Sequence, residues 1–164
     1  MSQEKEVMQL TSSDLQAMQR YKQAVVQAMG TPDTASSIVT AEVLGEGFSS
    51  LIGVLLKGFA GGSVAGAAGM IASTISGMMS VLDAQTKSDE YQAASQGLNV
   101  INSLVDIFNN HPDYTLMQVQ LSVIEWYSPE TGTTMAIIDG TADSPSDAYV
   151  IQRIQLNSGN WLDQ

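Results

Sequence analysis

Residues 88–123, SDEYQAASQGLNVINSLVDIFNNHPDYTLMQVQLSV, decide the fold class. In the first half of this stretch the apolar residues recur every three or four positions, which is the period of an amphipathic α-helix; they are Tyr91, Ala94, Leu98, Ile101, Val105 and Phe108. After His111-Pro112-Asp113 the period becomes two, as in a half-buried strand, with one face made of Met117, Val119, Leu121 and Val123. The change of period predicts an α+β protein in which helices precede a sheet.

The helical part is expected to span residues 11–110 as an N-terminal bundle of about four helices. Thr11 and Asp14 have the spacing of a capping box that opens the first helix, and Gly30 is a natural stop. Pro32 suits the first turn of a second helix. The third helix is expected to run to about Leu82, and the fourth to begin at Ser88, before two acidic residues.

Residues 113–164 are expected to form a three-stranded antiparallel meander. The first strand begins at Tyr114, the second runs from Thr133 to Asp139, and the third runs from Tyr149 to Leu156. One face of such a sheet has to be covered, and the helices are the cover that the chain offers. At 164 residues, the chain is expected to form a single domain, residues 1–164.

The 25 residues from Gly58 to Leu82 carry no charge, and as a helix they would span roughly 37 Å, enough to cross a bilayer. Small residues stand four apart in two rows, where a second helix backbone can approach closely; the rows are Gly58/Gly62/Gly66 and Gly61/Ala65/Gly69. Farther along, an apolar stripe of Ile71, Ile75, Met78 and Leu82 lies opposite Ser73, Ser76 and Ser80. We therefore expect this segment to be a central Gly/Ala-rich helix.

A second apolar stretch, residues 48–56, precedes this segment, and Lys57 with the following glycines would form the bend of a helical hairpin. The glycine row in an uncharged hairpin of an acidic protein resembles α-helical pore-forming and membrane-lytic toxins. The resemblance covers roughly residues 45–82 and implies that the hairpin is hidden in water, then meets membrane lipid or a membrane receptor and forms a homo-oligomer. The residues expected to insert are Phe48, Leu51, Ile52, Leu55, Leu56, Ile71, Ile75, Met78 and Leu82, and those expected to make helix–helix contacts are Gly58, Gly62, Gly66 and Gly69.

Two alternatives remain open at this point. The Gly-rich helix is either the core of a soluble interaction module or assembly subunit, or a zipper for soluble homo-oligomerisation. A helix that is apolar nearly all round is buried, and the sequence pattern is equally compatible with burial in protein and with burial in lipid.

The charge balance excludes one class of partner. With 17 acidic residues against 6 Lys and Arg, the net charge is -11, which argues against nucleic acid as a partner. The same charge opposes anionic lipid and predicts a neutral leaflet, a protein receptor, a second toxin component or activation at low pH. The charged residues 1–6 do not resemble a signal peptide, so we expect a protein secreted or released by another route, acting at a target-cell membrane.

We expect neither an enzyme, nor a cofactor, nor a metal site. The chain has no Cys, and His111 is expected in a solvent-facing loop, with a pH-sensing role as the alternative. Asp139, Asp143 and Asp147 are expected to be loop residues, with a calcium site as the alternative. The aromatic residues are expected either to pack in the core or sheet edge or to anchor at a lipid or carbohydrate interface; they are Trp126, Tyr127 and Trp161.

Overall fold

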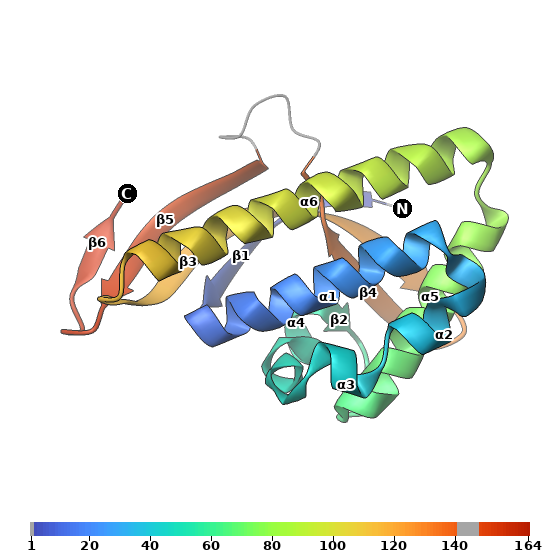
Figure 1. The fold of residues 1–164 in the computed structure, drawn as a ribbon, viewed down its shortest axis with the longest axis horizontal. Coiled ribbons are helices and arrows are strands. Elements are labelled where there is room, and N and C mark those ends of the chain that lie inside the picture. Colours follow the sequence, from blue (N-terminus) through green and yellow to red (C-terminus); the bar gives the residue numbers. More distant parts are fainter. Residues whose placement is uncertain (1, 141–147) are drawn as a thin grey trace.

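The computed structural model describes residues 2–140 and 148–164 and is α+β, as the change of period predicts. In these residues there are six α-helices: α1 (Ser12–Gly30), α2 (Ala35–Ile38), α3 (Ala41–Leu44), α4 (Ile52–Leu55), α5 (Val64–Val81) and α6 (Ala84–Asn110). They also form one six-stranded sheet of β1 (Ser2–Leu10), β2 (Leu56–Lys57), β3 (Tyr114–Ser128), β4 (Thr133–Ile138), β5 (Tyr149–Leu156) and β6 (Trp161–Asp163). Figure 1 shows α1 and α6 lying across this sheet.

The long strand β3 is the centre of the sheet. Residues 117–125 of β3 pair with β1, while residues 123–128 pair with β4 and residues 114–121 pair with β5. Because the same β3 residues pair on both sides, β1 lies on one edge of β3, and β4 and β5 lie end to end on the other. The outer strands β2 and β6 pair with β4 and β5, and every pairing is antiparallel.

The expected three-stranded meander is therefore too small a sheet. Its three strands are present, but β1, β2 and β6 were missed. Only Met8, Gln9 and Leu10 of β1 show alternating burial, and the charged residues 4–6 obscure that short signal. Strands β2 and β6 have two and three residues, so they are too short to show a period.

The first predicted helix is confirmed, and its capping box is formed. The backbone N–H of Asp14 donates to Thr11 Oγ1 at 3.1 Å, and the backbone N–H of Thr11 donates to Asp14 Oδ2 at 3.0 Å. The last long helix begins at Ala84 instead of Ser88, because the Asp83 carboxylate accepts the N–H of Thr86 at 2.8 Å and caps the helix one turn earlier.

The predicted second helix is wrong, because residues 32–55 form several short helical pieces. Two of these are 3₁₀ turns, Pro32–Thr34 and Glu46–Leu51, and the others are α2, α3 and α4. The chain is extended at Val39 and has a positive φ of 78° at Gly45, and neither conformation continues a helix. The expected bundle of about four helices is replaced by three long helices and these pieces.

The core lies between the sheet and the helices. The predicted inner face of β3 is confirmed, since Met117, Val119, Leu121 and Val123 are fully buried. Toward the end of β3 the opposite face is buried as well, at Ile124 and Trp126, and α5 contacts this strand.

Helix α6 approaches the end of β4 at two glycines. A Cβ on Gly97 would lie 1.9 Å from the carbonyl oxygen of Ile138, and a Cβ on Gly140 would lie 2.2 Å from the carbonyl carbon of Gln96. The N–H of Gly140 also donates to the carbonyl of Ala93 at 3.2 Å. Only residues without a side chain permit this contact between backbones.

Two polar side chains of α1 reach the same strand from within the core. The Tyr21 hydroxyl donates to the carbonyl of Ala136 at 2.8 Å, and the Lys22 ammonium donates to the carbonyl of Ile138 at 2.9 Å. Both side chains are fully buried. Burial lowers the pKa of Lys22 from 10.5 to about 7, against an opposing effect of the Asp139 carboxylate, because the charged ammonium is poorly solvated there.

Candidate functional site

Helix α5 is the long apolar helix that the sequence predicts, and it begins later than expected. Ser63 caps it by accepting the N–H of Gly66 at 3.0 Å. Within the described residues, it is the one helix long and apolar enough to cross a membrane by length and composition, and 44% of it is buried. Ile71 and Ile75 lie on its buried side, whereas the predicted serine face of Ser73, Ser76 and Ser80 is exposed.

The helical row Gly58/Gly62/Gly66 is not formed. Gly58 and Gly62 precede α5 and have positive φ angles of 86° and 74°, so the chain turns there. The row that α5 presents at four-residue spacing is Gly69, Ser73 and Gly77, and all three residues are exposed. A Cβ added to Gly69 or Gly77 would meet nothing within 4 Å, so no contact among residues 2–140 and 148–164 requires these positions to lack a side chain. We call this row the small-residue face.

Gly58 makes a different contact. A Cβ on this residue would lie 2.7 Å from the carbonyl oxygen of Gly132, in the turn between β3 and β4. The close approach therefore places Gly58 beside that turn.

The upstream residues expected to insert lie in the core of this fold. Phe48, Leu51, Ile52, Leu55 and Leu56 are 0–7% exposed. They belong to a 3₁₀ turn, to the single turn of α4 and to β2, which pairs with Met135 and Thr134 of β4. The first arm of the expected helical hairpin is therefore not one helix. It consists of short helical turns and the strand β2, and α5 follows it. Met78 on α5 and Leu82, the residue that follows this helix, are half-buried.

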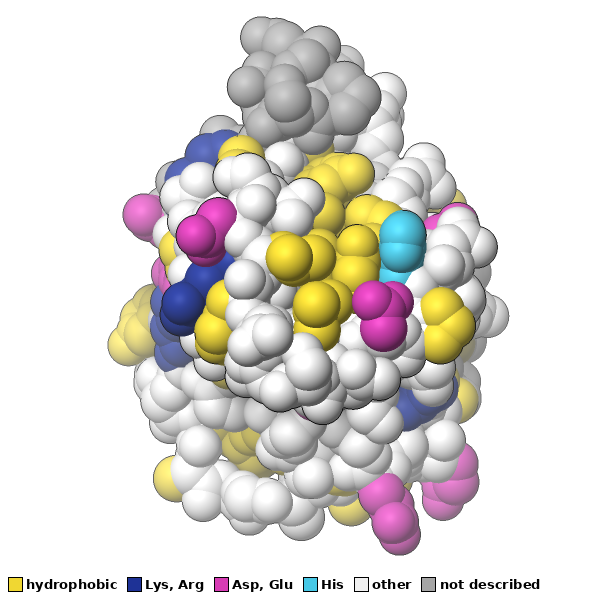
Figure 2. All heavy atoms as spheres, turned by 90° about the vertical axis from the view of Figure 1, so that its left-hand side faces the viewer, with side chains coloured by type: hydrophobic (Ala, Val, Ile, Leu, Met, Phe, Trp, Pro, Cys, Tyr) yellow, Lys and Arg dark blue, Asp and Glu magenta, His cyan; other side chains and the backbone are white. Residues whose placement is uncertain are grey.

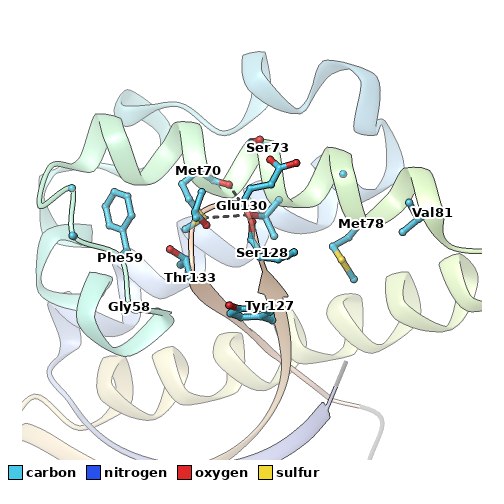
Figure 3. Close-up of a pocket in the computed structure, with 16 residues that line it drawn as sticks. Gly58, Phe59, Met70, Ser73, Met78, Val81, Tyr127, Ser128, Glu130 and Thr133 are labelled. Atoms are coloured by element: carbon cyan, nitrogen blue, oxygen red, sulfur yellow. Dashed lines mark hydrogen bonds between the residues drawn. The ribbon is translucent and has the colours of Figure 1, made fainter.

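An apolar cavity of about 720 Å³ lies between α5, residues 58–61 and the β3–β4 turn (Figure 3). We call it the α5 groove. A second hollow of about 480 Å³ lies between α5 and residues 32–36, and both hollows are lined by Ser73, Gly77 and Glu130. The small-residue face therefore runs beside two depressions in the surface.

Two buried threonines line the α5 groove, and their hydroxyl groups differ in hydrogen bonding. The Thr74 hydroxyl donates to the carbonyl of Met70 at 2.8 Å, drawn as a dashed line in Figure 3. Thr133 is 1% exposed, and its Oγ1 has no hydrogen-bond partner in the part of the chain that the structure describes. Among the described residues that line the groove, Glu130 is the one with a charge. Sequence reasoning missed Thr133 and Glu130, because only the fold brings their turn beside α5.

The three candidate aromatic residues do not form one surface. Trp126 is fully buried, in register with Met135, and this fits the core-packing alternative. Tyr127 is 59% exposed and lines the α5 groove. Trp161 lies on β6, where the guanidinium of Arg153 sits 4.1 Å from its ring centroid.

Of the other polar candidates, His111 and Asp139 lie among the described residues. His111 is exposed, as expected, and stacks on Tyr114 at 4.4 Å; Figure 2 shows hydrophobic side chains gathered beside it. Asp139 is buried, while Asp143 and Asp147 lie outside the described residues. In residues 2–140 and 148–164, no group of three His, Cys, Asp or Glu side chains is placed to hold a metal ion.

The site is therefore an apolar groove with a buried hydroxyl beside an exposed face of small residues. Comparisons of the chain with protein-family models, curated proteins and solved structures found no match.

Proposed function

We propose that this is a membrane-active protein that self-associates through α5 and inserts this helix into a target bilayer, permeabilising it. The observation that carries the proposal is the empty space over Gly69 and Gly77. Glycine inside a helix costs about 1 kcal/mol relative to alanine. Gly97 on α6 is required by a close backbone contact, whereas Gly69 and Gly77 have no such contact with any part of the chain that the structure describes.

The small-residue face is suited to contact with another helix. In a bilayer, helices associate by close packing of small residues, because lipid provides no hydrophobic force between them. The absence of charge from Gly58 to Leu82 makes the transfer of α5 into lipid feasible. The apolar side chains that would enter lipid are Ile71, Ile75 and Met78 of the helix and Leu82 directly after it. Insertion of residues 48–56 would follow as a later step, since it requires β2 to separate from β4.

The net charge of -11 predicts the conditions for activity. Anionic vesicles repel the protein near neutral pH, so we expect activity on neutral leaflets, through a receptor or second component, or after carboxylates are protonated.

Dye release from vesicles tests the proposal. Zwitterionic and anionic vesicles are mixed with the protein across about pH 4 to 8, and we expect release that is faster at the acidic end and on zwitterionic lipid. Gly77→Leu is expected to slow release about tenfold, because the new side chain prevents close packing of two helices. Gly62 is unsuitable for this test, because its positive φ would strain any side chain.

Ser103→Leu is the matched control, since it adds the same side chain at an exposed position of α6. It should release dye as the unmodified protein does. Release that Gly77→Leu leaves unchanged would show that the small-residue face is not the contact, and no release under any condition would remove the proposal.

The α5 groove favours a second candidate, a soluble interaction module. An apolar cavity of about 720 Å³ is of the size that ligand sites have. This candidate predicts a protein that never partitions into detergent or vesicles.

A further inference from the structure

Hydrogen bonds join the helices α1 and α6 to each other and to the sheet. Gln19 of α1 donates to Asn102 of α6 at 2.6 Å, and the buried Tyr21 and Lys22 of α1 donate to carbonyl groups of β4. The backbone of α6 also accepts the N–H of Gly140, two residues after β4. Moving either helix away from the sheet would therefore break several hydrogen bonds, which costs free energy until water replaces them.

Helix α5 differs from α1 and α6 in this respect. Among residues 2–140 and 148–164, the hydrogen bonds of α5 all stay within residues 63–81. Besides the backbone bonds of the helix, the Ser63 side chain accepts the N–H of Gly66, and the hydroxyls of Thr74 and Ser80 donate to carbonyls one turn earlier. The helix has no charged residue and so makes no ion pair. It can therefore leave its neighbours without breaking a hydrogen bond to the described part of the fold.

Packing holds α5 in place, and this packing is interrupted. The α5 groove of about 720 Å³ lies on one side of the helix, and the hollow of about 480 Å³ beside residues 32–36 lies on another. Side chains that line a hollow contact fewer protein atoms, so they contribute less packing energy. Of the eight buried residues of α5, three are alanines and one is a threonine, whose burial removes less apolar area from water than that of a larger side chain.

The chain on both sides of α5 is suited to act as a hinge. Before the helix, residues 60–62 are exposed and belong to no helix or strand, and Gly62 has a positive φ of 74°. After the helix, Leu82 is extended, and the Asp83 carboxylate caps α6 by accepting the N–H of Thr86. Because α5 and α6 each have a cap of their own, α5 can change direction while both helices keep their hydrogen bonds.

We propose that α5 detaches from the folded protein as an intact helix, pivoting on residues 60–62 and 82–83, while α1, α6 and the sheet stay folded. The motion exposes the buried side of α5, with Ile71 and Ile75, in addition to the small-residue face. This inference rests on the proposed function for the purpose of the motion, which is to make α5 available to a bilayer. The detachment itself is a property of the protein in water.

Thiol labelling of the folded protein tests the inference, since the chain has no cysteine. Ala67→Cys and Ala72→Cys place a thiol on the buried side of α5, and Ala94→Cys is the matched control on α6; these alanines are 0–4% exposed. A buried thiol reacts with an excess of an aromatic disulfide reagent only when its surroundings open. We expect both α5 thiols to react at least about a hundredfold faster than the α6 thiol.

The dependence on urea separates detachment from unfolding, because it grows with the surface that each opening exposes. Labelling in α5 should change little at low urea concentrations, whereas labelling in α6 should rise steeply, as global unfolding does. Urea denaturation of each variant corrects the rates for any stability that the substitution removes, and Ala68→Cys, at a residue 3% exposed, replaces either α5 variant that does not fold.

Two results would overturn the inference. One is labelling of the α5 thiols with the rate and urea dependence of the α6 thiol, which would show that α5 opens only on global unfolding. The other is fast labelling at a single α5 position, which would show fraying of the helix and not its detachment. Because no vesicle is present, a failure here is separate from a failure of dye release.

Discussion

Gly97→Ala is expected to lower the melting temperature by about 6 °C, which corresponds to a loss of about 2 kcal/mol in this size of protein. The added methyl group would lie 1.9 Å from the carbonyl oxygen of Ile138 and 3.3 Å from the Lys22 ammonium. The backbone has to move, and the movement weakens the hydrogen bond from Lys22 to that carbonyl. Thermal unfolding followed by circular dichroism measures the change.

Gly69→Ala is the matched comparison, since Gly69 is also inside a helix but has open space around its Cα. This variant should melt about 2 °C higher than the unmodified protein, because alanine favours the helix and meets no neighbour. Equal destabilisation by the two changes would contradict the packing of α5 and α6 described above.

The free energy of unfolding is expected to rise by about 3 kcal/mol between about pH 6 and pH 9.5, because of Lys22. The folded pKa of about 7 lies below the ordinary value of 10.5. Between these values the unfolded chain binds a proton that the folded chain does not, so raising the pH favours the folded state. The rise ends near pH 10, where ionisation of tyrosine favours unfolding, because burial raises the pKa of Tyr21 in the folded state.

Urea denaturation at a series of pH values measures this effect. Lys22→Met should remove most of the rise, while Lys87→Met, which removes a positive charge at a position that is not buried, should retain it. A flat profile for the unmodified protein would show that Lys22 is charged, or solvated, in the folded state.

The fold class is predictable from residues 88–123 because each period there is long enough to be read. The helical period over α6 and the alternation over β3 are both set by burial on one face. The burial of Met8 and Leu10 in β1 depends instead on β3, more than a hundred residues away, as their register with Val119 and Met117 shows. The buried face of α6 also differs from the predicted apolar face. Tyr91, which was expected on that face, is 42% exposed, whereas Gly97 and Leu104, which were not, are buried.

The candidate site is predictable only in part. Composition identifies α5, and its serine face is exposed as expected. The four-residue spacing predicts that Gly58 and Gly62 are helical, but both have a positive φ. Glycine adopts the conformation of a turn as readily as that of a helix, so the spacing of glycines cannot distinguish the two. The α5 groove combines residues 58–61, 70–81 and 127–133, and no local pattern shows that these segments meet.

The central claim is that the small-residue face of α5 is exposed in the folded protein and that α5 inserts into a membrane. The chain has no cysteine, so Val81→Cys can carry a single environment-sensitive fluorophore at the exposed end of α5, outside the row of Gly69, Ser73 and Gly77, and Ser103→Cys can carry the same label on α6. When vesicles are added under the conditions that release dye, emission at position 81 should shift to the blue and gain intensity, while emission at position 103 stays unchanged. An unchanged spectrum at position 81, across about pH 4 to 8 and with both kinds of vesicle, would contradict the account.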